Sequence, residues 1–480
     1  MIRGKIFDIL GRFSSAELRR FGDFAASPYF NRNKKIAALA DIFISHAPDF
    51  ESLELEKKAL FDTLYPGKEY KDSAIRTLIS DLTRLAERFI VEQALEDNPM
   101  LMEKMLAASF REKHLYALFE KKLSEVRSLL DNGAVSREDY GVIAGILQEV
   151  CELNYLKHLE NVEKVKDGFF EAIMYSKLEY YKTFLGIYKE MLSHNLSYKY
   201  EPDAKLADEF ARLGNEVESD PEIKEKHPSI YAEYLCCMIL LRYKGESSYY
   251  KKLFDYINKF KKKFTAEELH SKYLVALNYC THHLDRHTKK FLDESLKVIR
   301  AMEEDTLKEL RYMEPNSFEA IASCMIYARH TDWLVKFLKR NIKKLPDELQ
   351  DNTRNYLLGR MYFTIGEYDK ALEYLAKVKY LRIHHYTHSK VLMAQIYYSF
   401  GEYDNCLTSL DLLKRYVKRK EIMVTDTYNM MNDFAVYAAR LAILAGNKNE
   451  KGLMRLEKDL SDMKESVLKS WILDKVKMLK

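Results

Sequence analysis

Apolar residues recur at intervals of three and four positions along most of the chain, a pattern typical of α-helices with one buried side. The clearest example is the segment 73–95, in which Ile75, Leu78, Ile79, Leu82, Leu85 and Phe89 keep this spacing. Alternation with a period of two, which would indicate strands, is absent. The pattern therefore predicts an all-α fold of helices joined by short loops.

The first ninety-seven residues predict a small helical domain. Ser14 and Glu17 have the spacing of a capping box, in which each residue satisfies a backbone N–H of the other. Ser27-Pro28 is a break, because proline disfavours the α conformation in the residue before it. Further helices are expected over 33–45, over 55–64 and from Asp72 or Ser73 to residue 95. We predict three segments: an N-terminal helical domain (1–97), an irregular array of helical hairpins (98–312) and a repeat array (313–480).

A repeat of 35 residues stands out in the last segment. The tetrapeptide Gly-Glu-Tyr-Asp at 366–369 recurs at 401–404. Around it, Gly359, Tyr362, Gly366, Tyr368, Ala371 and Leu375 correspond to Ala394, Tyr397, Gly401, Tyr403, Cys406 and Leu410, and the same interval carries Tyr362 back to Tyr327 and Tyr368 back to Trp333. Small residues at fixed offsets let two helices approach closely, and glycine permits a tight turn between them. A helix pair cannot bury its own apolar side, so neighbouring pairs are expected to stack.

These residues resemble the tetratricopeptide repeat family, whose unit is a helix-turn-helix of about 34 residues. The resemblance covers 352–419, and extends to 317–351 with Lys336 and Arg340 at positions that the family keeps small or apolar. It implies an α-solenoid, here with a small N-terminal helical domain. The 35-residue interval and the absence of the family's closing proline, replaced by Ile383 and Lys418, leave the angle between units open.

In that family the first helices of successive units line a concave groove that holds an extended peptide or a helix. Carried over by position, the lining here is Thr353, Tyr356, Arg360, Phe363, His388, Val391, Gln395 and Tyr398. The resemblance thus implies a scaffold or adaptor that binds a mixed apolar and acidic segment of a protein partner. The Lys/Asn set that clamps a C-terminal carboxylate in some members is not present. The competing interpretation is that these side chains only pack against the next unit.

Histidines gather at two places, and each place is a candidate metal site. One place holds His282, His283 and His287 near Cys280, and the other holds His384, His385 and His388. In each, two histidines four residues apart share one helical side, as a zinc site requires. No second ligand pair completes either set. We predict histidines on helix surfaces, with no metal and no other cofactor.

Composition narrows the remaining classes. The chain has only 16 glycines and 9 prolines, and this scarcity of helix-breaking residues favours long helices. The 77 basic and 73 acidic residues leave a net charge of +4, which is too small to create a broad positive potential that would attract nucleic acid or anionic lipid. Six scattered cysteines indicate core residues in a reduced compartment. No signal peptide or membrane-spanning run is found, so a cytoplasmic protein without a membrane contact is expected.

The sequence carries no known signature of catalysis: there is no phosphate-binding glycine loop and no nucleophile elbow, so an enzyme is not predicted. The basic runs 259–263 and 414–420 fit helix ends, where cations are favourable. The 34 tyrosines are explained largely by the repeat.

The alternative function is a DNA-binding regulator that uses residues 55–95 as a helix-turn-helix and the repeats for sensing or oligomerisation. Ser73, Arg76, Thr77 and Arg84 would then be exposed. The connection of about eight residues exceeds the three or four usual in that motif, and no wing follows. Residues 1–97 carry 15 basic and 16 acidic residues, whereas DNA-binding domains are usually basic.

Overall fold

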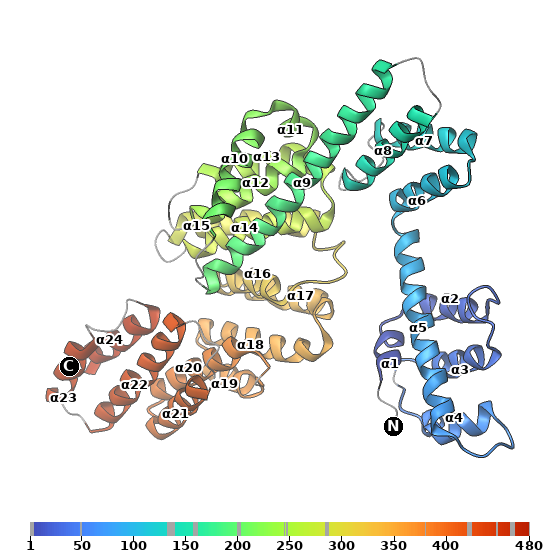
Figure 1. The fold of residues 1–480 in the computed structure, drawn as a ribbon. Helices are drawn as coiled ribbons and strands as arrows, with labels where there is room; N and C mark the ends of the chain where they lie inside the picture. The colour runs from blue at the N-terminus through green and yellow to red at the C-terminus, as the bar shows by residue number, and fades with distance from the viewer. Residues whose placement is uncertain are drawn as a thin grey trace. The chain divides into compact units, whose positions relative to one another are not determined.

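The structure of the chain, a computed structural model, is entirely helical over the residues that it describes (Figure 1). These residues are 4–48, 50–131, 140–156, 162–198, 203–243, 245, 248–283, 288–379, 381–419, 425–447, 450–460 and 466–479. They form 24 α-helices and three 3-10 helices, with no strand, which confirms the prediction of an all-α fold. Within the described residues, no helix combines the length and the apolar character needed to cross a membrane.

Contacts within the chain separate it into two compact units, residues 1–179 and 180–480, and each is described by itself. The division falls inside one long helix, α9 (Val162–Tyr198). It therefore coincides with neither predicted boundary, 97/98 nor 312/313, and the three predicted segments stay predictions.

The first unit contains α1 to α8 and the beginning of α9. The helices are α1 (Lys5–Leu10), α2 (Ser15–Ala26), α3 (Lys34–Ser45), α4 (Lys57–Leu64), α5 (Asp72–Glu96), α6 (Pro99–Glu112), α7 (Tyr116–Asp131) and α8 (Tyr140–Leu156), with a 3-10 turn at Leu53–Leu55. The expected helices of the first ninety-seven residues are thus confirmed. The apolar stripe of α5 is buried against α1 to α4, in a core that includes Phe21, Phe43 and Phe89.

Local sequence signals account for the ends of two of these helices. The capping box at α2 is present: the Glu17 carboxylate accepts from the Ser14 N–H at 2.7 Å, and the Ser14 hydroxyl accepts from the Glu17 N–H at 3.3 Å. The expected cap of α5 by Asp72 or Ser73 is wrong, because Lys71 is the N-cap and makes no side-chain cap. Asp72 instead forms ion pairs with Lys57 at 3.0 Å and with Arg76 at 2.5 Å.

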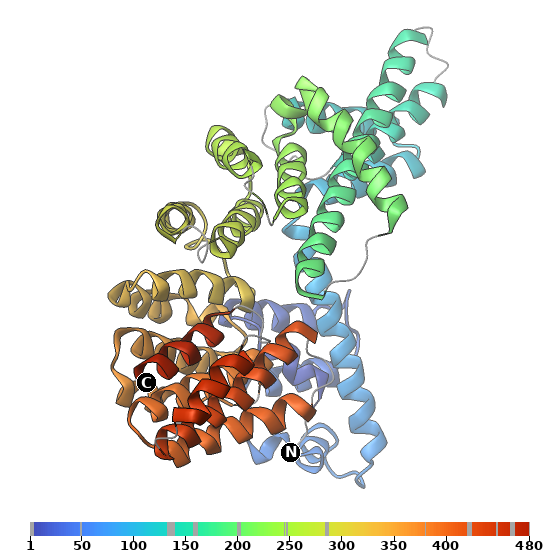
Figure 2. The same cartoon turned by 90° about the vertical axis from the view of Figure 1, so that its left-hand side faces the viewer.

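The second unit continues as a succession of helix pairs (Figure 2). Its helices are α10 (Ala204–Ser219), α11 (Pro221–Lys226), α12 (Pro228–Leu241), α13 (Ser248–Phe260), α14 (Ala266–His282), α15 (Thr288–Asp305), α16 (Pro315–Tyr327), α17 (Thr331–Asn341), α18 (Asp347–Ile365), α19 (Tyr368–Ala376), α20 (Ile383–Ser399), α21 (Tyr403–Arg419), α22 (Thr425–Asn447), α23 (Glu450–Asp459) and α24 (Val467–Leu479).

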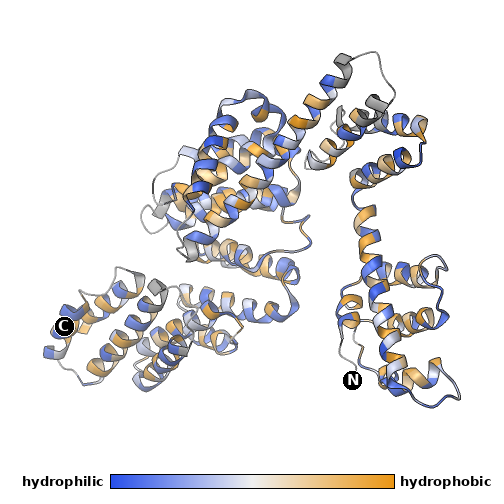
Figure 3. Cartoon of the chain, in the orientation of Figure 1, coloured by the Kyte–Doolittle hydropathy of each residue, from blue (hydrophilic) through white to orange (hydrophobic). Residues whose placement is uncertain are grey.

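From α12 onward each even-numbered helix packs against the helix that follows it and against the next even-numbered helix. Each of these helices carries both hydrophobic and hydrophilic residues, as Figure 3 shows. The side of an even-numbered helix that faces away from the second helix of its pair is called its inner side below. Such packing gives each pair two neighbours, as the argument from unburied apolar sides predicts.

The predicted turn recurs with the same geometry in two pairs, α18–α19 and α20–α21. Gly366 ends the first helix of one pair with φ +84°, and Gly401 has φ +76° in the other. After each glycine, the N–H of the next residue donates to the carbonyl oxygen five residues earlier, at 3.0 Å and 2.9 Å respectively. Positive φ is the region that favours glycine, so these two glycines permit the tight turns as predicted.

The small residues of the repeat also lie where two helices meet. Ala371, Ala394 and Cys406 are buried. A Cβ atom at Gly359 would lie 2.6 Å from Cδ2 and 2.7 Å from Cγ of Leu375 in α19, so that only glycine permits this approach.

Substituting Gly359 with alanine is therefore expected to destabilise the second unit. Overpacking typically costs about 1–3 kcal/mol, more than the gain of about 0.5–1 kcal/mol from replacing a helical glycine. Gly186 in α9 is the matched control, because nothing lies within 4 Å of its added Cβ, and alanine there should stabilise. Chemical denaturation of both variants tests this, and a shift of the same sign in both would contradict it.

The aromatic residues of the repeat differ in their surroundings. Tyr362 stacks on Tyr374 of α19, with ring centroids 5.5 Å apart. Tyr368 reaches Phe400 at 6.0 Å, and Tyr403 reaches Tyr398 at 5.6 Å.

Three further aromatic residues of the repeat have other surroundings: Tyr327 and Trp333, which lie 35 residues before Tyr362 and Tyr368, and Tyr397. Tyr327 is 45% exposed. Trp333 stacks on Phe337 at 4.9 Å and donates its Nε1–H to Glu303 at 2.9 Å. Tyr397 is partly buried beside α21 and α22. The sequence also predicts a further helix pair over about 425–480 with Gly446 as its turn. In the structure α22 continues through Gly446 to Asn447, and α23 begins at Glu450.

All six cysteines are buried and unpaired, which confirms that they are core residues. They are Cys151, Cys236, Cys237, Cys280, Cys324 and Cys406.

Candidate functional site

The eight residues expected to line a partner-binding groove lie on α18 and α20, but five of them are interior. Thr353, Tyr356, Val391, Gln395 and Tyr398 are each less than 9% exposed. In this conformation these five side chains offer a partner almost no surface. Only Arg360, Phe363 and His388 are partly exposed.

Neighbouring even-numbered helices cover the interior residues. The ring of Tyr356 stacks on His385 of α20 with centroids 4.1 Å apart, and its hydroxyl lies 2.7 Å from His388 Nδ1. The ring of Tyr398 meets Trp471 of α24 at 5.4 Å. Val391 belongs to the core that α20 shares with α21 and α22. The burial of these side chains thus follows from close packing between the first helices of successive pairs. The family resemblance did not predict the angle at which these helices pack.

The accessible part of the inner side lies on α16, α18 and α20. We call it the Arg360 surface and define it by Ser323, Tyr327, Arg360, Phe363, His384 and His388. Tyr327 follows Ser323 by one turn on α16, and Phe363 follows Arg360 by one turn on α18. Two aromatic side chains thus accompany a cation.

Arg360 has no carboxylate partner among the described residues. Its Nη1–H donates to the Ser323 hydroxyl at 2.7 Å, and its guanidinium lies over the Tyr356 ring, 5.3 Å from the centroid. Guanidinium carries five N–H donors in a planar fork that matches a carboxylate. Arg360 is therefore a partly exposed cation with unused donors.

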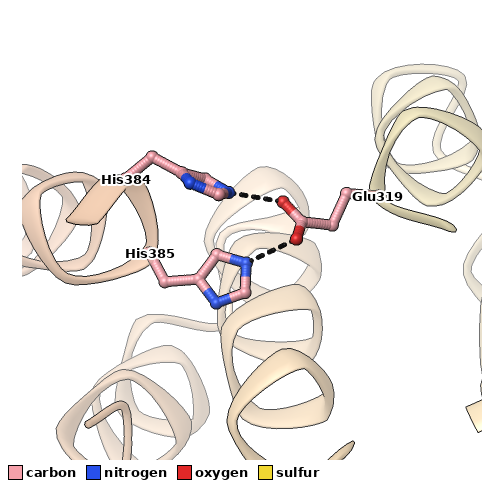
Figure 4. Close-up of side chains that lie close together, drawn as sticks. All are labelled: Glu319, His384 and His385. Atoms are coloured by element: carbon pink, nitrogen blue, oxygen red, sulfur yellow. Dashed lines mark hydrogen bonds and ion pairs between the residues drawn. The ribbon is translucent and has the colours of Figure 1, made fainter. Parts of the chain in front are cut away.

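A polar cluster centred on Glu319 links α16 to α20 (Figure 4). The Glu319 carboxylate lies 2.6 Å from His384 Nε2 and 2.9 Å from His385 Nε2. Arg382 Nη1 is 2.9 Å from the same carboxylate. The Glu319 side chain is 11% exposed, whereas that of His384 is 49% exposed. Glu319 is not among the residues predicted from the sequence, because it lies outside the two repeats that match well.

Glu319, His384 and His385 place their ligand atoms within 4.8 Å of one another, close enough for one metal ion. The hydrogen bonds around His385 oppose this use. The Lys379 N–H donates to Asn352 Oδ1 at 2.6 Å, which turns the amide nitrogen of Asn352 toward His385 Nδ1 at 3.2 Å. His385 thus accepts at Nδ1 and carries its proton at Nε2, the atom that a metal would need unprotonated.

The charges around the cluster oppose a cation as well. Arg382 already places a guanidinium on the Glu319 carboxylate, so a metal ion would meet a like charge there. His388, which shares a helical side with His384, is engaged with Tyr356 instead. The residues present therefore fit a hydrogen-bonded cluster between helices and do not fit a metal centre.

Burial sets the charge states of the cluster. Burial alone would raise the pKa of Glu319, but the hydrogen bonds from His384 and His385 outweigh it and lower the pKa to about 2. Burial lowers the pKa of His385 despite the opposing effect of Glu319. Burial, followed by the charge of Arg360, lowers the pKa of His388 to about 3. The cluster therefore holds the Glu319 carboxylate next to the neutral imidazole of His385.

The same reasoning predicts that mild acid destabilises the second unit. Burial also lowers the pKa of His270 to about 4. A buried neutral histidine contributes stability above the unfolded pKa of about 6.5, and this stability is lost as the pH falls below it. The contribution of His270 should fall from about pH 6.5 to 4, and that of His388 from about 6.5 to 3.

Denaturation at pH 7.5, 6 and 5 tests this dependence. The His270→Gln variant should show a shallower decline, and the exposed His330→Gln variant should behave like the parent. A stability that is equal at pH 7.5 and 5 would contradict the prediction. The window lies above the range in which the Glu319 carboxylate becomes protonated.

A second buried cluster lies at α9, α12 and α14. The Glu233 carboxylate lies 2.6 Å from Lys272 Nζ and 3.1 Å from Lys189 Nζ, and Lys189 also donates to the Ser271 hydroxyl at 3.0 Å. The lysine side chains are 1% and 8% exposed respectively. Burial alone would raise the pKa of Glu233, but the two lysine charges outweigh it and lower the pKa to about 2. Three charges are thus held together in the interior.

The other candidate sites have ordinary partners. His283 Nε2 lies 3.0 Å from the Tyr243 carbonyl oxygen, and His287 lies outside the described residues. In the basic run 259–263, Lys259 pairs with Glu225 at 2.7 Å and Lys261 pairs with Asp305. These lysines connect neighbouring helices.

The four residues considered for DNA contact are exposed on α5, as expected. Arg76 pairs with Asp72 and Arg84 pairs with Asp81, so acidic neighbours offset both cations. No strand that could form a wing is present among the described residues. DNA binding stays a prediction that no observation favours.

Compared with models of protein families, with curated proteins and with solved structures, the chain matches none of them. The assignment of a function therefore depends on the geometry described above.

Proposed function

We propose that this chain is a scaffold that binds another polypeptide through the Arg360 surface, and that its stacked helix pairs form an α-solenoid similar to tetratricopeptide arrays. The observation that carries the proposal is Arg360 itself, a partly exposed cation beside Tyr356 that has no carboxylate partner among the described residues. Arginine and tyrosine are the residue types that most often dominate binding energy at protein interfaces.

The recurrence of one turn geometry at Gly366 and Gly401 supports the solenoid part of the proposal. So does the packing of each even-numbered helix against the next. The proposal describes a binding protein and not an enzyme, because the histidines and the carboxylate of the Glu319 cluster are engaged with one another.

Photo-crosslinking in the cells that produce the chain tests the proposal. Benzoylphenylalanine placed at Tyr327 or at Phe363 should capture the same polypeptide. The control position is Lys370 on α19, whose side chain is 58% exposed and lies outside the Arg360 surface. Equal capture from Lys370, or no product from Tyr327 and Phe363 at natural expression levels, would show that this surface holds no partner.

A further inference from the structure

The charge at the Arg360 surface is unbalanced. Arg382 is neutralised by Glu319, whereas Arg360 meets the Ser323 hydroxyl and the ring and hydroxyl of Tyr356, with no carboxylate partner among the described residues. Ser323 accepts from Arg360, so its own O–H can still donate. Donors from two adjacent helices therefore converge without an anion between them.

The chain itself shows what kind of element fits the inner side of its helix pairs. Residues 180–198 of α9 lie across α10, α12 and α14 (Figure 1). Tyr180 donates to Glu209 of α10 at 2.6 Å, the Leu185 carbonyl oxygen lies 3.5 Å from Cys237 of α12, and Lys189 reaches Ser271 of α14. A helix thus occupies this part of the inner side.

The position of Arg360 on α18 matches the position of the α9 contact on α12. Tyr231 of α12 meets Tyr256 of α13 at 4.9 Å, and Glu233, two residues later, contacts α9. Tyr362 meets Tyr374 of α19, and Arg360, two residues earlier, lies on the opposite side. Two residues correspond to 200° around a helix, so Glu233 and Arg360 both belong to the inner side.

The inner sides of α12 and α18 present side chains of opposite charge. On α12 the inner side presents Glu233, and the helix that covers it supplies Lys189. On α18 the inner side presents Arg360, so the complementary occupant carries an acid. The exposed Tyr327, and the part of Phe363 that Tyr368 of α19 leaves uncovered, favour apolar neighbours for that acid.

We infer that the Arg360 surface receives an α-helical segment of a partner polypeptide, through an Asp or Glu side chain flanked by apolar residues. The inference rests on the proposed function and specifies its ligand. A carboxylate fits better than a phosphate, because Arg360 is a single unpaired cation and a planar carboxylate matches its fork bidentately.

The test uses a displayed library of helical peptides, randomised on one side and selected on the full chain. Enriched peptides should share one Asp or Glu with apolar residues three or four positions away. A charge-assisted hydrogen bond predicts that Arg360→Gln weakens their binding about 10- to 100-fold, and that changing the peptide's acid to its amide adds little further loss.

Three variants keep the test decisive. Arg360→Glu should favour peptides with Lys or Arg, Ser323→Ala should weaken binding less than Arg360→Gln, and Lys370→Glu should leave binding unchanged. Thermal unfolding of each variant establishes that it is folded. Inorganic phosphate at low millimolar concentration should not compete with the peptides. Effective competition would overturn the inference of a carboxylate and show that the Arg360 surface binds a phosphate.

The outcomes separate the two proposals. Peptides that depend on Tyr327 and Phe363 but not on Arg360 would overturn the carboxylate inference and leave the proposed function standing. Enriched peptides that ignore all three side chains would overturn both.

Discussion

Replacing Glu233 with glutamine is expected to destabilise the second unit by about 3–5 kcal/mol, the usual cost of leaving a buried charge without its partner. The substitution keeps the shape of the side chain but removes the negative charge that Lys189 and Lys272 share. Lys272 is 1% exposed, so water cannot replace the lost carboxylate. Hydrogen exchange should show the loss of protection in α12 and α14.

Two further variants define what this result means. Glu222→Gln breaks an exposed pair with Lys226 on α11 and should change stability little. Replacing all three members by apolar residues (Lys189→Met, Glu233→Leu, Lys272→Met) should recover most of the loss, because buried ion pairs contribute little net stability. If Glu233→Gln were as stable as Glu222→Gln, the three charges would not form the compact cluster described.

Replacing Glu319 with leucine is expected to lower the free energy of unfolding of the second unit by a similar amount, about 3–5 kcal/mol. The change removes the acceptor for His384 and the carboxylate that lies beside His385, and it leaves Arg382, 16% exposed, without its carboxylate. Because Glu319 connects α16 to α20, protection from hydrogen exchange should fall at both helices. Glu319→Gln should be milder, since an amide oxygen still accepts one hydrogen bond.

The exposed Glu348→Gln variant on α18 is the control for Glu319 and should resemble the parent. Loss of protection at α18 alone, with α16 and α20 unchanged, would contradict the role of Glu319 as a connection between them. Zinc added to the parent should not raise its thermal stability, since His385 carries its proton at Nε2.

Much of the secondary structure could be predicted because its causes are local. The stripe from Ile75 to Phe89 alone predicts α5, and the spacing of Ser14 and Glu17 predicts the start of α2. Gly366 and Gly401 predict two turns because few other residues adopt positive φ. Each of these features depends on residues within one or two turns of one another.

The candidate site could be predicted only in part, because burial depends on helices far along the chain. The repeat placed Tyr356 and Tyr398 on the inner side, but the sequence could not reveal that His385 and Trp471 cover them. Ser323 becomes relevant only through its contact with Arg360. The angle between successive units decides such contacts, and no local pattern encodes that angle.

One feature of the sequence indicates the buried charges around Glu233. Glu233 is the only charged residue between Pro228 and Leu241, a segment otherwise rich in apolar side chains. A lone acid in such a segment indicates a buried partner of opposite charge, since an isolated buried carboxylate is costly. Its partners, Lys189 and Lys272, are about forty residues away on either side and cannot be identified from spacing.

Because the cysteines are buried, their reactivity reports the local unfolding of the helices that carry them. Burial raises the pKa of Cys236, Cys280, Cys324 and Cys406 to about 12, so these thiols are almost entirely protonated at neutral pH and react slowly while their helices stay packed. Alkylation followed by mass spectrometry would therefore time the exposure of α12, α14, α16 and α21 separately. Cys151 on α8 gives the corresponding time for the first unit, from the same sample and without any introduced label.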